Sequence, residues 1–97
     1  MPYSPQTTIE TPVILLIQAA ESFACLSLGN DVLDAFLDIQ EKLCEVMEEI
    51  GDPLPYAHTW HFLNNQAQAS LMKFLQGNID ALDELKECVR ISVELIP

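Results

Sequence analysis

Cations are scarce in this chain, and their scarcity argues against several classes of function. The 97 residues contain four Lys and Arg against fifteen Asp and Glu, which gives a formal net charge of −11 at pH 7. So acidic a surface repels nucleic acid and anionic membranes and attracts basic proteins. We therefore expect no direct nucleic-acid binding and no membrane association, and we expect the partner to present a basic protein surface.

Motifs that carry chemistry are also missing from the sequence. It contains no glycine-rich phosphate loop and no Gly-x-Ser-x-Gly turn. His58 and His61 could share a metal ion on a helix, but a zinc site needs three or four ligands, and no cysteine or carboxylate lies within a turn of this pair. The chain is therefore predicted not to be an enzyme and to have no catalytic residues, no metal site and no cofactor. An enzyme would require one of these histidines to meet Cys44 or Cys88 in a pocket.

Close cysteine pairs and long apolar runs are absent as well. Cys25, Cys44 and Cys88 fall on three different predicted helices, and an odd number of distant cysteines is not typical of a disulfide framework. Each is predicted to be a small buried hydrophobe in a reducing cytoplasm. The apolar stretch 13–28 has no positively charged segment before it, and Glu21 lies within it, so it predicts a soluble core helix rather than a signal peptide or a membrane span.

Helix-start and helix-stop residues divide the chain into four parts. Thr11 and Pro12 form a hydroxyl N-cap followed by proline at the first helical position. Glycines end the first three predicted helices, asparagines cap the second and fourth, and the segment 52–55 (DPLP) cannot continue a helix. The glycines are Gly29, Gly51 and Gly77, and the asparagines are Asn30 and Asn78.

These signals predict an all-α fold, a four-helix bundle of two antiparallel helical hairpins. The predicted helices span about 12–28, 30–50, 56–76 and 78–96. Residues 1–11 are predicted to form an extended N-terminal arm, and residues 12–97 a single helical domain. The helix 12–28 is apolar around much of its circumference, so we expect it at the centre of the bundle.

The most distinctive feature present is a row of acids on the second predicted helix. Residues 31–52 contain eight carboxylates and one cation, Lys42. At ~100° per residue all eight fall within an arc of roughly 100°, opposite an apolar stripe that suits a core. Seven of them lie between positions 31 and 49 and are called here the acidic face. They are Asp31, Asp34, Asp38, Glu41, Glu45, Glu48 and Glu49.

The acidic face costs stability, because like charges on neighbouring turns repel. At ~0.2–0.5 kcal/mol per pair, about seven such pairs sum to roughly 2 kcal/mol. The face spans ~27 Å at 1.5 Å per residue, or one charge per ~4 Å, close to the ~3.4 Å between phosphates of a DNA strand. A surface that only keeps a protein soluble usually mixes signs. The face is therefore interpreted either as a solubilising surface or as a binding surface for a basic partner.

Two functional hypotheses follow. In the leading one, the chain is a small, non-enzymatic, acidic helical binding protein whose acidic face engages a basic surface of a partner protein, for example a nucleic-acid-binding protein. Its sharper form is an inhibitor that mimics nucleic-acid charge, as phage-encoded antagonists of nucleases and CRISPR complexes do; this is an analogy of size and charge alone. The alternative is a structural, assembly or adaptor protein that docks or forms a homodimer through apolar surfaces, either the first helix or a secondary interface of Tyr56, Trp60 and Phe62.

Overall fold

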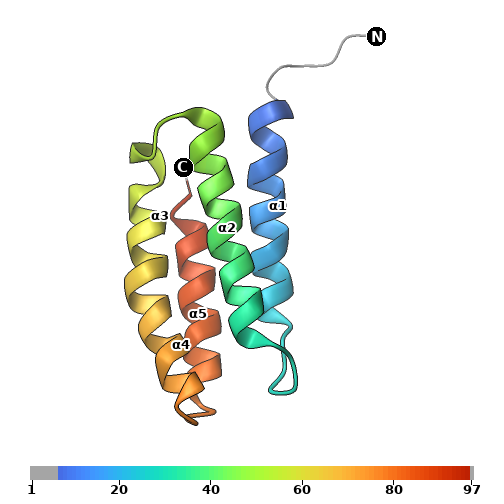
Figure 1. Cartoon of the computed structure of the whole chain (residues 1–97), viewed down its shortest axis with the longest axis vertical. Coiled ribbons are helices and arrows are strands. Elements are labelled where there is room, and N and C mark those ends of the chain that lie inside the picture. The colour runs from blue at the N-terminus through green and yellow to red at the C-terminus, as the bar shows by residue number, and fades with distance from the viewer. Residues whose placement is uncertain (1–6, 97) are drawn as a thin grey trace.

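Four helical segments build the part of the chain that the computed structural model describes, residues 7–96 (Figure 1). α1 spans Thr7–Ala24, α2 spans Val32–Ile50 and α5 spans Ala81–Glu94. The third segment runs almost without a break through η1 (Leu54–Tyr56), α3 (Ala57–Phe62), the π-helical turn η2 (Leu63–Ala67) and α4 (Gln68–Leu75). No strand occurs within these bounds, and the segments lie side by side along the long axis. The predicted all-α bundle is confirmed, and the pairing into two antiparallel hairpins stays a prediction.

The core lies between the inward faces of all four segments. Its largest fully buried side chains are Phe23 of α1 and Phe36 of α2, whose rings meet edge to face with centroids 6.5 Å apart. Aromatic pairs of this geometry contribute ~0.5–1.5 kcal/mol beyond the area they bury. The other core residues are Leu16, Ala20, Val32, Ile39, Leu43, Val46, Tyr56, Leu63, Ala67, Leu71, Leu82, Leu85 and Val89.

α5, and not α1, packs against most of the other elements. It contacts α1, α3, η2 and α4, whereas α1 contacts chiefly α2 and α5. The predicted central position of the first helix is therefore wrong. A helix at a corner of a bundle has two neighbours whatever its composition, so Ile14 and Leu15 of α1 stay exposed while Leu16 and Ala20 are buried.

α1 begins at Thr7, five residues before the predicted start, and Pro12 lies inside it. Proline lacks the backbone N–H that would donate to the carbonyl one turn earlier, so local preferences favour proline in the first turn of a helix over its interior. Once a preceding turn has formed, the fixed φ of proline still fits a helix. Residues 7–11 are therefore helical rather than extended, and residues 1–6 of the predicted arm lie outside the described part of the chain.

The link between α1 and α2 is longer than predicted, because α1 ends at Ala24 rather than at residue 28. Asp31, and not Asn30, caps α2: its carboxylate accepts a hydrogen bond from the backbone N–H of Asp34 at 3.0 Å. Asn30 instead closes the link, with its Oδ1 accepting from the backbone N–H of Ser27 at 2.7 Å. Gly29 does not adopt the left-handed conformation predicted for it.

The other predicted glycine ends are left-handed as expected. Gly51 has φ 72° and its N–H donates to the carbonyls of Met47 and Glu48, which terminates α2. Gly77 has φ 105° and follows the end of α4. Asn78 does not open α5, which begins three residues later; its Oδ1 accepts from the N–H of Asp80 at 3.1 Å and so shapes the turn before the helix.

Candidate acidic interface

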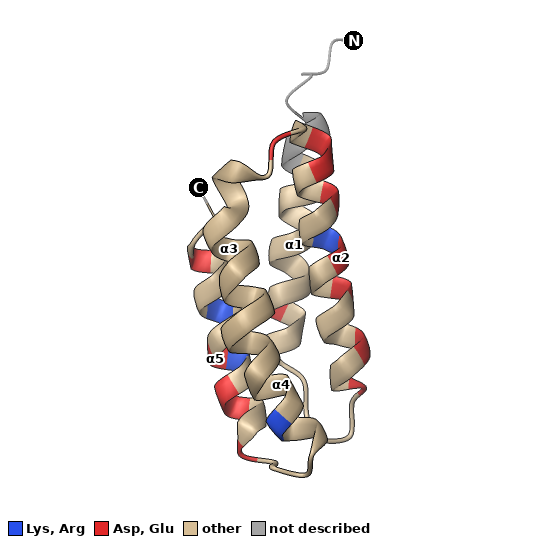
Figure 2. Cartoon of the chain, turned by 60° about the vertical axis from the view of Figure 1, so that its left-hand side comes forward, with Lys and Arg blue, Asp and Glu red and all other residues tan. Residues whose placement is uncertain are grey.

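The acidic face forms one continuous exposed edge of α2 (Figure 2). All seven of its side chains are exposed, and they lie opposite the residues that α2 contributes to the core. The structure therefore brings the sequence-predicted carboxylates together on one surface. Within residues 7–96, Asp38 is the only member with an ion pair, to Lys42 at 3.2 Å. The remaining charges of the face are left to the solvent.

The helix dipole makes negative charge unfavourable at the carboxyl end of the acidic face. Asp31 and Asp34 lie at the amino end of α2, where the helix dipole stabilises negative charge. Glu48 and Glu49 lie in the last turn, where the dipole disfavours it, and no basic residue occupies that turn. Packing of the helix does not require acids there, because both side chains are exposed.

Lys42 is held within the acidic face rather than available to neutralise it broadly. Its hydrogen bond to Asp38 raises the pKa of the ammonium group, and the charges of Asp38, Glu45 and Glu41 act in the same direction. The cation is therefore firmly charged and already engaged. A basic ligand would meet the remaining carboxylates with little competition from the protein itself.

The predicted secondary interface does not form a single surface. Tyr56 is 7% exposed and belongs to the core, so its assignment to an interface is wrong. Its backbone (φ −109°, ψ 11°) departs from α-helical values where η1 meets α3, so the spacing of a regular helix does not apply there. Trp60 and Phe62 are half-buried and line different hollows, the first beside Met47 and the second beside Leu95.

The candidate catalytic and metal-binding side chains lie at the surface or are partly buried. His58 and His61 are both exposed, and the hollow they share is lined by no cysteine. Cys25 is exposed, so the prediction that it is buried is wrong: α1 ends at Ala24 and leaves it in the link. Cys44 and Cys88 are half-buried. Across the described residues, no three His, Cys, Asp or Glu side chains gather where they could hold a metal ion.

None of the helices within residues 7–96 is both long enough and apolar enough to cross a bilayer.

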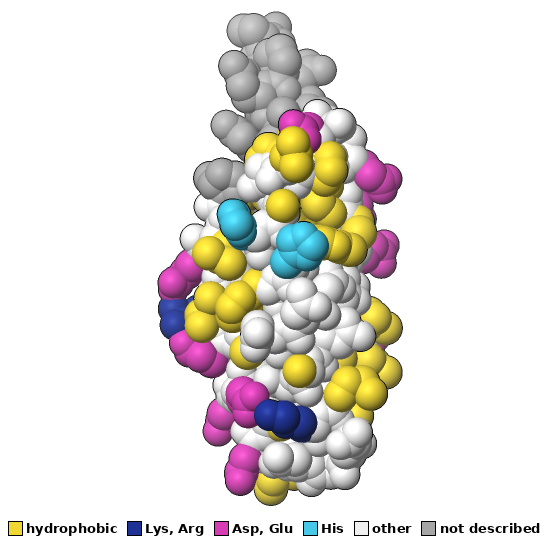
Figure 3. Space-filling view, turned by 90° about the vertical axis from the view of Figure 1, so that its left-hand side faces the viewer, with side chains coloured by type: hydrophobic (Ala, Val, Ile, Leu, Met, Phe, Trp, Pro, Cys, Tyr) yellow, Lys and Arg dark blue, Asp and Glu magenta, His cyan; other side chains and the backbone are white. Residues whose placement is uncertain are grey.

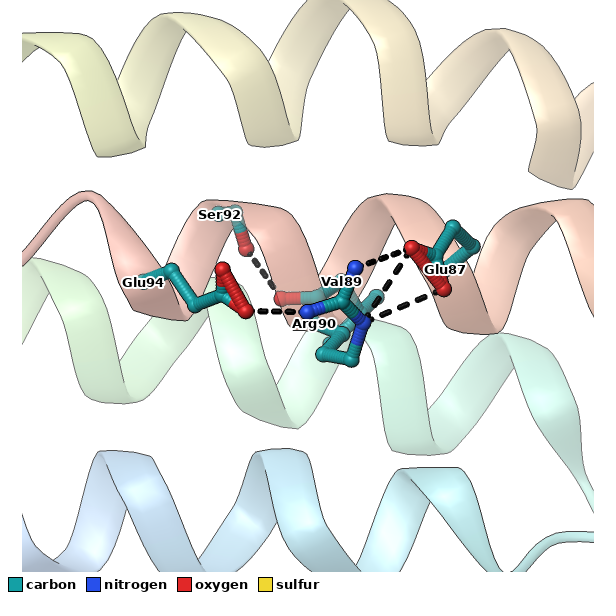
Figure 4. Close-up of polar contacts among 5 residues, drawn as sticks. All are labelled: Glu87, Val89, Arg90, Ser92 and Glu94. Atoms are coloured by element: carbon teal, nitrogen blue, oxygen red, sulfur yellow. Dashed lines mark hydrogen bonds and ion pairs between the residues drawn. The ribbon is translucent and has the colours of Figure 1, made fainter.

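The acids of α5 are arranged differently, because two cations form ion pairs with three of them. Arg90 lies between Glu87 and Glu94 and forms ion pairs with both (Figure 4). Lys73 of α4 reaches Glu84 at 3.3 Å. A hydrogen bond from the buried Ser70 hydroxyl at 2.9 Å, followed by the contact with Lys73, lowers the pKa of Glu84 below its usual value.

One feature that the sequence did not predict is a groove of about 420 Å³ between α1 and α5. Ala20 and Ala24, one turn apart on α1, leave space beside Ile17 and Val93. Charged residues of both signs line its rim, and Lys86 there donates to the backbone carbonyl of Leu26. The two alanines were the available signal, since small residues on one face of a helix mark a close approach or a hollow.

Comparison with known proteins finds no match: no family model, no curated protein and no solved structure resembles the chain at a significant level.

Proposed function

We propose that this chain is a small, non-enzymatic binding protein whose acidic face engages a basic surface of a partner protein, in a cytoplasmic setting. The observation that carries the proposal is the row of seven exposed carboxylates on α2, of which Asp38 alone within residues 7–96 is ion-paired. Neighbouring like charges lower the stability of the free protein, and a cationic partner would remove that penalty on binding.

The spacing of the charges supports a sharper form of the proposal, a mimic of nucleic-acid charge. The face presents one carboxylate per ~4 Å along a straight helix, and a DNA strand presents one phosphate per ~3.4 Å. A groove that binds a nucleic-acid backbone through Lys and Arg would bind such an edge by the same interactions. The protein would then inhibit a nuclease or a CRISPR complex by occupying its nucleic-acid site.

Charge reversal with a matched control tests whether binding of a basic partner depends on the acidic face rather than on net charge. One variant replaces Asp38, Glu41 and Glu45 with lysine. The control replaces three exposed acids elsewhere, Glu21, Asp80 and Asp83, with lysine and changes the net charge by the same amount. The probe is a fluorescein-labelled, arginine- and lysine-rich peptide of 16 residues, and its binding is measured by fluorescence anisotropy at low and high salt.

The proposal predicts a loss of affinity of more than tenfold in the α2 variant and less than threefold in the control, with binding of the unaltered protein weakening as salt rises. Equal losses in the two variants would overturn it, because attraction would then follow total charge alone. Failure of the unaltered protein to bind at low salt would overturn it as well. Circular dichroism serves as the check that both variants remain helical.

The inhibitor form has its own test, in which the protein competes with substrate. Inhibition is measured for a panel of DNases, RNases and RNA-guided nucleases, with the two reversal variants as controls. We expect inhibition of at least one enzyme that excess nucleic-acid substrate relieves and that the α2 variant lacks. If no enzyme in the panel is inhibited, or if inhibition survives the α2 reversal, the nucleic-acid-mimic form is discarded.

A further inference from the structure

A second surface adjoins the acidic face, and it is apolar. Between the acids of α2 and the third helical segment, five large hydrophobic side chains are exposed along the line where the two helices meet. We call this line the α2–α4 seam. Its exposed side chains are Leu33, Leu37, Leu54, Met72 and Leu75, which are between 40% and 77% exposed.

A hydrogen bond locates the seam in the fold. Gln40 of α2 donates through Nε2 to Oδ1 of Asn64 in η2 at 2.8 Å, so these two residues mark facing sides of their helices. Leu37 and Leu33 lie about one and two turns before Gln40, on the same side of α2. Met72 and Leu75 lie about two and three turns beyond Asn64. Hydrophobic residues of both helices therefore flank one line.

The two helical segments that flank the seam are also less closely packed than the other neighbouring segments of the bundle. The backbone of α2 approaches α1 closely along its length but makes no comparably extensive approach to α3, η2 or α4. At the end of the seam nearest Gly51, a hollow of about 370 Å³ opens, with Met47, Leu54 and Trp60 among its lining residues. Figure 3 shows hydrophobic side chains gathered along the edge of the α3–α4 face on the side where α2 lies.

The charges around the seam differ from one side to the other. The α2 side carries the acidic face, whereas the α4 side carries mostly amides, and its cation Lys73 is engaged with Glu84. A ligand lying in the seam would therefore contact hydrophobic side chains below it and carboxylates along one flank. Its complement is a helix with an apolar stripe and a row of Lys or Arg beside that stripe, the arrangement by which amphipathic helices bind grooves.

We infer that the α2–α4 seam binds a basic amphipathic helix of the partner protein. The inference rests on the proposed function and specifies the shape of the partner element. Together with the hollow beside Met47, the seam extends ~21 Å along α2 from Leu33, which accommodates about four turns of helix. Exposed leucine and methionine beside the acids supply apolar contact that a purely electrostatic interface lacks. Binding would then retain part of its strength at high salt.

Charge argues against a second copy of this chain as the occupant. A two-fold dimer places the same patch of both subunits in contact. Such a dimer through the seam would set two acidic faces beside each other, in a protein whose formal net charge is −11. A basic helix relieves that repulsion, and a second copy increases it.

The test uses two peptides of identical composition, each of 15 residues built from lysine and leucine. In one, the leucines recur at helical spacing and form a single stripe; in the other, they are scattered around the helix. We expect the striped peptide to bind at least tenfold more tightly, to become helical on binding, and to change the emission of Trp60, the single tryptophan in the chain.

Two matched variants separate the seam from general hydrophobicity. Leu37→Gln with Met72→Gln alters the seam, and Leu28→Gln with Ile79→Gln alters two slightly more exposed side chains in the links outside it. The seam variant should lose at least tenfold in affinity for the striped peptide and keep its affinity for the scattered one. The control variant should lose less than twofold for either.

The outcomes distinguish the inference from the proposed function. If both peptides bind the unaltered protein equally and the seam variant changes nothing, the inference is overturned; should the α2 charge reversal still abolish binding, the proposed function stands. If the charge reversal leaves both affinities unchanged, the proposed function itself fails. A dimer in sedimentation experiments that persists at high salt and is lost in the seam variant would also overturn the inference, with a second copy as the occupant.

Discussion

α2 and α5 have similar amphipathic designs but use their acids in opposite ways. Each helix buries an apolar stripe and exposes several carboxylates. On α5, Arg90 and Lys73 form ion pairs with three of them, and the fourth, Asp83, lies in the first turn, where the dipole favours it. On α2, a single ion pair accompanies seven acids, and the acids continue into the last turn. The two helices therefore differ both in formal net charge, −5 for α2 and −2 for α5, and in the share of their acids that is ion-paired.

Their positions in the bundle differ as well. α5 is packed against α1 and the whole third segment, so its charged side chains find partners on its own and neighbouring helices. α2 packs closely on α1 alone and leaves a broad outer surface free of other elements of the described chain. The helix with fewer neighbours has room for a partner, and it is also the helix with uncompensated charge.

The largest expected effect compares the core contributions of the two helices. Leu43 of α2 and Leu85 of α5 are both fully buried. Leucine-to-alanine substitution at such sites costs ~2–5 kcal/mol. We expect Leu85→Ala to fall nearer the upper end than Leu43→Ala, because a helix packed on more sides leaves the cavity less able to collapse. Urea unfolding followed by circular dichroism measures both, and a larger loss for Leu43→Ala would contradict the central place of α5.

A smaller effect is expected when charge is removed from each helix. Glu45 has like charges at Glu41, Glu48 and Glu49, one turn away on either side. Glu45→Gln should raise the free energy of unfolding by roughly 0.5 kcal/mol at low salt, since three repulsive pairs at ~0.2–0.5 kcal/mol each are removed and one attraction of similar size, to Lys42, is lost.

The control for that change is Glu87→Gln on α5, which removes a partner of Arg90 and should lower the stability. Thermal unfolding at 20 mM and 500 mM salt measures both variants. Both differences should shrink at high salt. Changes of the same sign in the two variants would show that the distinction between paired and unpaired acids is wrong.

The third prediction concerns acid titration on α5. Ser70 and Lys73 lower the pKa of Glu84, so this carboxylate stabilises the fold above its unfolded value, near 4.3, and that contribution is lost as the pH falls through the lowered pKa. Ser70→Ala should move the titration midpoint of Glu84 upward, toward the unfolded value. NMR of the side-chain carboxyl carbon reads the midpoint directly. A midpoint that does not move would remove Ser70 from the network.

The smallest effect is chemical and lies on α2. Burial, followed by the charges of Glu48 and Glu41, raises the pKa of the Cys44 thiol, so less thiolate is present at neutral pH. Maleimide should therefore label Cys44 several-fold more slowly than the exposed Cys25, and Glu48→Gln should slightly reduce the difference between the two labelling rates. Single-cysteine versions of the protein allow the two rates to be measured separately. Faster labelling at Cys44 would show that burial and the neighbouring carboxylates do not protect this thiol.

The acidic face was predictable because it depends on one helix only. The carboxylates recur within one arc of a helical wheel, and any straight helix over 31–50 brings them together. Neighbouring segments were harder to predict where local preferences compete. Asn30 and Asp31 are both good N-caps, and which of them caps α2 depends on the hydrogen bond that Asn30 makes to Ser27 in the link.

The predicted secondary interface was wrong for a different reason. Helical spacing places Tyr56 and Trp60 on one side, but the switch from η1 to α3 turns Tyr56 into the core. The π-helical turn η2 is a further departure that periodicity does not reveal. The α2–α4 seam likewise requires two helices far apart in sequence to face each other, as the hydrogen bond between Gln40 and Asn64 shows.

Local sequence accounts for the helical class, the left-handed ends at Gly51 and Gly77, and the exposed row of acids on α2, because each depends on residues within a few turns of one another. The tertiary arrangement accounts for the central place of α5, for the ion pair between Lys73 of α4 and Glu84 of α5, and for the exposed hydrophobic residues of α2 and α4 along one seam. These outcomes depend on which helices become neighbours. Packing of the whole core determines that choice, and the pattern of any single helix does not.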